Sequence, residues 1–99
     1  MPVSEARIQS EYAQRYVGQL CKHFQHKLPV EYRAGTPTAT GHITFEFGSC
    51  DLVGEDEILT MRAVAETEDD LRRLEDVLAR HLERFAFRDN PPIVWADAA

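Results

Sequence analysis

The chain has 99 residues, of which 43% are hydrophobic, and a formal net charge of −6. This length and apolar content predict a single globular domain over residues 1–99 and exclude an intrinsically disordered chain. The acidic balance argues against nucleic-acid binding, which requires a basic surface.

The N-terminal part predicts a strand followed by an amphipathic helix. The strand is expected over residues 3–8, and Ser10 is expected to cap the helix. Apolar side chains recur three and four positions apart, which indicates a helix with one apolar face, continuing to about Lys27. Pro29 prevents its continuation.

Four strands are expected between this helix and a second one, because short alternating runs are separated by glycine-containing turns. The topology depends most on Gly48 and Ser49, which we expect to form a two-residue hairpin turn. With that turn the two helices run antiparallel; without it, three strands intervene and the helices run parallel. The expected segments, in chain order, are strand 30–34, loop 35–41, strand 43–47, strand 50–53, turn 54–56 and strand 59–65.

A second helix begins after Thr67, whose side chain is expected to cap it, with acidic residues in its first turn. Leucines from Leu71 to Leu82 form its apolar stripe, and a short strand is expected over residues 93–95. The order β-α-β-β-β-β-α-β predicts an α+β two-layer sandwich, with both helices on one face of an antiparallel sheet.

The cysteines and the N-terminal residues bear on the cellular compartment. Cys21 and Cys50 are too few for a disulfide framework. Residues 1–10 do not resemble a signal peptide, and no segment has the roughly 18 apolar residues of a membrane span. We therefore expect a cytoplasmic protein with reduced thiols.

The histidines are the first candidates for chemistry. His23 and His26 are favoured as part of a basic helix end, against the alternative of an incomplete metal site. His81 lies at the edge of the second apolar stripe. It is interpreted either as a hydrogen-bonded residue at the edge of the core, or as an acid/base group or ligand contact in a cleft. In antiparallel helices, His23 and His81 are expected to lie more than roughly 12 Å apart and to share no metal. The basic end of the first helix would instead meet the acidic residues 68–70.

The end of the second helix is the predicted ligand site, because cationic and titratable groups gather there beside aromatic residues. The alternative is that the arginines only cap the helix and stack on Phe87 or Trp95. No metal and no cofactor is expected. The predicted ligand-binding residues are His81, Arg84 and Arg88, with Tyr12, Arg15 or Tyr16 opposite them.

Several segments resemble the bacterial family called domain of unknown function 2218. They are residues 20–24 (LCKHF), 41–45 (GHITF) and 81–88 (HLERFAFR), together with Trp95. The family has no established activity. The resemblance implies a link with siderophore-dependent iron uptake, because some members are fused to or encoded beside siderophore-interacting ferric reductases.

Three functions follow as alternatives. The favoured one is a non-catalytic accessory module that binds an iron–siderophore, another anionic small molecule, or a partner reductase. The second is a small enzyme that uses His81 or His23 as acid or base. The third is a homodimerisation module with no small ligand. No phosphate-binding loop or nucleophile motif is present, so the sequence predicts no reaction.

Overall fold

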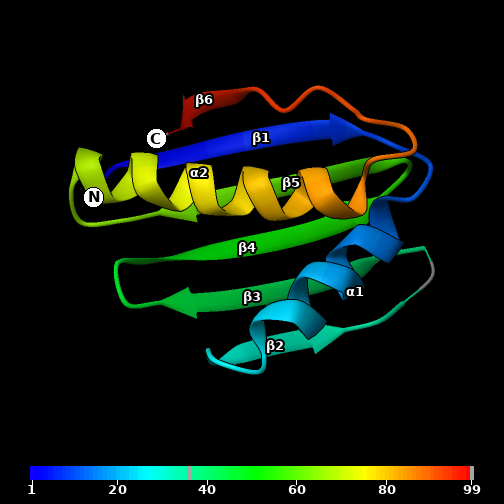
Figure 1. The fold of residues 1–99 in the computed structure, drawn as a ribbon, viewed down its shortest axis with the longest axis horizontal. Coiled ribbons are helices and arrows are strands. Elements are labelled where there is room, and N and C mark those ends of the chain that lie inside the picture. Colours follow the sequence, from blue (N-terminus) through cyan, green and yellow to red (C-terminus); the bar gives the residue numbers. More distant parts are fainter. Residues whose placement is uncertain (36, 99) are drawn as a thin grey trace.

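A computed structural model describes residues 1–35 and 37–98. Six strands form one antiparallel sheet in the order β2-β3-β4-β5-β1-β6, and both helices cover the same face (Figure 1). This confirms the predicted α+β sandwich and its order of elements. The elements are β1 (Val3–Gln9), α1 (Ala13–Phe24), β2 (Val30–Arg33), β3 (Ala39–Phe45), β4 (Gly48–Glu55), β5 (Ile58–Val64), α2 (Glu68–Phe85) and β6 (Trp95–Ala98).

The two faces of the sheet differ in chemistry. Inward side chains such as Ile43, Leu52 and Met61 are fully buried. Helix α1 packs mainly on β3 and β4, and α2 on β4 and β5. The other face is polar, as predicted. It carries a row of laterally paired residues of mostly alternating charge: Glu31, His42, Asp51, Arg62 and Glu5.

The predicted hairpin between β3 and β4 forms, but its turn is not at Gly48 and Ser49. Phe45 pairs with Gly48, so Glu46 and Phe47 make the turn. The turn predicted at 54–56 is also displaced, but toward the C-terminus. Its two central residues are Asp56 and Glu57, both with positive φ (52° and 61°), as a type I′ hairpin turn requires.

Two glycines that were predicted to lie in a loop and a turn instead lie in strands, where they allow close packing beneath α1. A Cβ on Gly41 would lie 2.5 Å from Cys21 Sγ, and one on Gly54 would lie 2.7 Å from the carbonyl oxygen of Ala13. Both glycines therefore lie inside strands, at points where a helix approaches the sheet. The predicted loop 35–41 is shorter than expected, because β3 already begins at Ala39. Thr36, within the predicted loop, lies outside the described residues.

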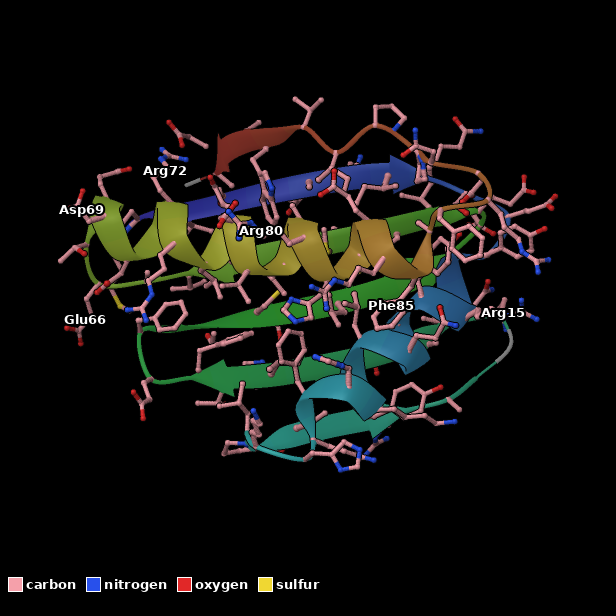
Figure 2. All side chains as sticks on the ribbon, in the orientation of Figure 1. Arg15, Glu66, Asp69, Arg72, Arg80 and Phe85 are labelled. Carbon is pink, nitrogen blue, oxygen red and sulfur yellow. The ribbon has the colours of Figure 1, made fainter. Side chains whose placement is uncertain are left out.

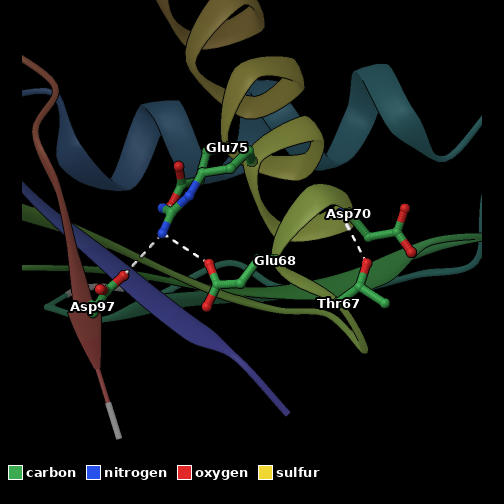
Figure 3. A network of polar contacts seen from close by, with 6 residues as sticks. Thr67, Glu68, Asp70, Glu75 and Asp97 are labelled. Atoms are coloured by element: carbon green, nitrogen blue, oxygen red, sulfur yellow. Dashed lines mark hydrogen bonds and ion pairs between the residues drawn. The ribbon is translucent and has the colours of Figure 1, made fainter.

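The two helix starts differ in how well they follow the sequence pattern. Thr67 caps α2 as predicted, accepting a hydrogen bond from the Asp70 backbone N–H at 3.1 Å (Figure 3). Ser10 does not cap α1, which begins only at Ala13. Its hydroxyl accepts a hydrogen bond from the Tyr12 backbone N–H at 3.1 Å, ahead of the helix, and donates one to Asp89, 79 positions away.

The first turns of α2 are held to the edge strand β6. The Arg72 guanidinium contacts Glu68, Glu75 and Asp97 at 2.8–3.2 Å (Figure 3). Glu75 is 8% exposed, so Arg72 neutralises a carboxylate that is largely removed from water. Glu68 is thus paired within its own helix, not with the basic end of α1 as the sequence suggested.

The helices run in opposite directions, as predicted (Figure 1), but they are staggered. The start of α1 lies beside the segment that follows α2, since Tyr16 hydrogen-bonds to Asp89. His23 lies seven positions after Tyr16, which is about 10 Å along α1, and this brings His23 level with the C-terminal half of α2. The predicted separation of His23 from His81 is therefore wrong: their ring centroids lie 4.6 Å apart.

Candidate functional site

A groove of about 510 Å³ opens between the end of α1, the β3–β4 turn and the middle of α2. Its aromatic floor is a chain of three rings. The Phe24 and Phe45 centroids lie 5.2 Å apart, and those of Phe45 and Phe47 lie 5.6 Å apart. The lining residues are His23, Phe24, His26, Lys27, Leu28, Phe45, Glu46, Phe47, Arg73, Val77 and His81.

The backbone places Phe45 and Phe47 differently. Phe45 is the last residue of β3 and points inward, where it is 8% exposed. Phe47 lies in the turn and is only half-buried. The Arg73 guanidinium from α2 lies 4.2 Å from the Phe47 ring centroid, within the range of a cation–π contact. The floor is therefore apolar, with a fixed positive charge at one end.

The rim of the groove is positive although the chain is acidic. Lys27 and Arg73 carry full charges, and three histidines line the same groove; Glu46 is the single acidic residue among the lining residues described. Desolvation lowers the pKa of His23, and repulsion from His81, Arg84, His26 and Lys27 lowers it further. The groove thus suits a ligand with an apolar body and a negative group.

His23 and His81 form a close pair of imidazoles. Their ring planes are inclined by 50°. The Nδ1 of His81 lies 2.7 Å from the Val77 carbonyl oxygen. Because a carbonyl can only accept, Nδ1 donates this hydrogen bond, and Nε2 takes no part in it. His81 is therefore a satisfied helix residue that also presents a free nitrogen.

The predicted ligand residues are divided between two places. His81 lines the groove, while Arg84 is exposed on the last turn of α2. A second hollow, of about 250 Å³, lies where α1 begins and α2 ends; Figure 2 shows Arg15 and Phe85 at this end of the molecule. Its lining residues are Tyr12, Arg15, Tyr16, Gln19, Phe85, Phe87 and Arg88.

Tyr16 has a structural partner in this second place. Its side chain is 3% exposed, and its hydroxyl donates to Asp89 Oδ1 at 2.5 Å. Burial and this hydrogen bond raise the pKa of Tyr16 to about 12. The hydrogen bonds from Ser10 and Tyr16 lower the pKa of Asp89. Arg88 lies over Phe87, one of the two stacking partners expected for it.

Sequence reasoning did not identify Phe47 or Arg73. Phe47 continues the alternation of strand β3 in the sequence, so it was assigned to a strand instead of a turn. Arg73 is one of several charged residues on α2, and nothing local distinguishes it. Only the contact between the β3–β4 turn and α2 reveals their role.

The other reactive groups are placed elsewhere. Both cysteines are buried and free, and burial raises the pKa of Cys21 to about 11 and that of Cys50 further. His42 Nδ1 lies 2.6 Å from Asp51 Oδ1, on the sheet face away from the helices. Within residues 1–35 and 37–98, no group of three or more His, Cys, Asp or Glu side chains is placed to hold a metal ion. No helix in this part of the chain is long and apolar enough to cross a membrane.

Comparison with known proteins gives the family. A search of the curated proteins found no match. The NMR structure of PA4090 from Pseudomonas aeruginosa is similar to this chain, with 32% sequence identity and a TM-score of 0.75; the match covers 97% of this chain and 96% of that one. A family described as an uncharacterized protein conserved in bacteria, DUF2218, matches residues 5–96. The chain therefore belongs to the DUF2218 family of bacterial proteins.

Proposed function

We propose that this protein is a non-catalytic binding module of the bacterial cytoplasm and that the groove is its site. The ligand class is a small organic anion with an aromatic body. The observation that carries the proposal is an aromatic floor beneath a positive rim on a chain whose net charge is −6. The floor provides stacking surface, and Arg73 and Lys27 attract the negative group.

The lining of the groove supports binding over catalysis. Among the described residues that form it there is no serine, threonine or cysteine that could act as a nucleophile. The rings nearest to His81 are those of His23 and Phe24, at 4.6 and 4.8 Å between centroids. The histidines thus contact aromatic groups, which suits a recognition surface.

The link with siderophore-dependent iron uptake that the family resemblance implies is part of this proposal. A catecholate chelator combines an aromatic ring with anionic oxygens, and these are the two features that the groove would recognise. The ligand roles of Arg15, Tyr16, Arg84 and Arg88 stay predictions, because only His81 among the predicted residues lines the groove.

Fluorescence titration with anilinonaphthalene sulfonate, a non-chelating aromatic anion, tests the proposal. With EDTA present, we expect one molecule bound per chain, with weaker binding at higher salt. Arg73→Gln should weaken binding by about tenfold, which is about 1.4 kcal/mol. The matched control is Arg7→Gln, since Arg7 is exposed on the other face of the sheet.

The controls distinguish the groove from general charge effects. Equal losses in Arg73→Gln and Arg7→Gln would show that net charge, not the groove, governs binding. Saturable binding that is unchanged in Arg73→Gln would place the site elsewhere. The same titrations with 2,3-dihydroxybenzoate, with and without ferric ion, test the catecholate ligand class directly.

A further inference from the structure

We propose that His23 and His81 form a two-imidazole binding site for a divalent late first-row metal ion, with copper(II) as the best-fitting ion. The pair lies on two different helices, and both rings line the groove. The proposal concerns a metal site and does not require the organic anion of the preceding section.

The spacing of the rings fits a single ion. Imidazole nitrogens bind such ions at about 2.0–2.1 Å, so each ring centroid lies about 3.2 Å from the metal. Two rings at right angles about the metal then have centroids about 4.5 Å apart, and tetrahedral ligation gives about 5.2 Å. The observed 4.6 Å matches the right angle, which is the angle of tetragonal copper(II) or nickel(II) sites.

The orientation of the His81 ring also fits. The hydrogen bond from His81 Nδ1 to the Val77 carbonyl orients the ring and leaves Nε2 as the metal-binding atom. Metal-ligating histidines commonly have such a backbone partner.

The surrounding charges oppose a bare cation and limit its affinity. Lys27 and Arg73 line the same groove, and the charge of Arg84 repels positive charge at His23. Two imidazoles leave the other coordination positions of the ion open to water or an anion. We therefore expect a bound anion to offset the repulsion, so that copper binds more tightly when a chelating anion such as salicylate is added.

Titration of the full chain with copper(II), followed by electron paramagnetic resonance, tests the site without any organic anion. We expect one equivalent per chain, with coupling to two imidazole nitrogens. His23→Gln and His81→Gln should each weaken binding by tenfold or more and remove the two-nitrogen signature. His42→Gln is the matched control, because His42 lies on the opposite sheet face beside Asp51.

The outcomes separate this inference from the proposed function. Binding that is unchanged in His23→Gln, or lost equally in His42→Gln, overturns the copper site. His23 is exposed, so this variant is informative even where His81→Gln does not fold. Copper binding without sulfonate binding refutes the proposed function alone, and the reverse result refutes the metal site alone.

Discussion

Substitution of Tyr16 by phenylalanine removes one hydroxyl and leaves the packing of a buried ring unchanged. That hydroxyl donates to Asp89 at 2.5 Å. A hydrogen bond to a charged group contributes about 1.5–3 kcal/mol, and less where water can replace the lost partner. Asp89 is exposed, so we expect a loss near the lower limit, about 1–1.5 kcal/mol.

Urea denaturation followed by far-UV circular dichroism measures this loss, and a thermal midpoint lower by about 5–10 °C should accompany it. The loss should also depend on pH. The pKa of Asp89 is lowered from its ordinary 3.8 in the folded state, so its stabilisation is present above that value and disappears as the pH falls through the folded pKa. The difference between Tyr16→Phe and wild type should therefore shrink in acid.

A double-mutant cycle decides whether the bond is the cause. Tyr16→Phe and Asp89→Asn should be strongly non-additive, since either change removes the same contact. Additive effects, or a Tyr16→Phe variant as stable as wild type, would refute the assignment of Tyr16 to a structural bond. Weaker sulfonate binding in a fully stable Tyr16→Phe variant would instead favour the ligand role predicted from the sequence.

Three further outcomes are expected. Gly54→Ala should destabilise the fold by about 1–3 kcal/mol in urea denaturation, because its Cβ would meet the Ala13 carbonyl oxygen at 2.7 Å; wild-type stability would contradict the close approach of α1. Cys21 and Cys50 should resist Ellman's reagent in the native protein and react once it is unfolded, since burial raises the pKa of both thiols. Affinity for anilinonaphthalene sulfonate should rise as the pH falls below 6.5, the ordinary pKa of His23, because protonation adds positive charge to the groove; the rise should be smaller in His23→Gln.

The features that sequence reasoning predicted correctly are those set by neighbouring residues. The leucine stripe from Leu71 to Leu82 and the cap at Thr67 depend on contacts three or four positions apart, and α2 begins where they indicate. The alternation of apolar residues likewise predicted which face of the sheet is buried. These patterns need no knowledge of the rest of the chain.

The features that it missed depend on contacts between distant segments. Ser10 has the side chain of a helix cap, but its hydroxyl donates a hydrogen bond to Asp89, 79 positions away. That contact and the Tyr16–Asp89 hydrogen bond join the start of α1 to the segment after α2, and His23 lies about two turns further along α1. Gly41 and Gly54 have the composition of turns, yet each lies in a strand because α1 leaves no room for a side chain.

The acidic balance of the chain and a positive groove are compatible, because charge acts locally in salt solution. Asp56 and Glu57 lie in the β4–β5 turn, at the other end of β4 from the turn that borders the groove. Eight residues of strand span about 26 Å, well beyond the Debye length of about 8 Å at physiological salt. A long polyanion would contact both regions and be repelled by one of them. A small anion contacts only the groove, so the net charge that argues against nucleic acid leaves this class of ligand open.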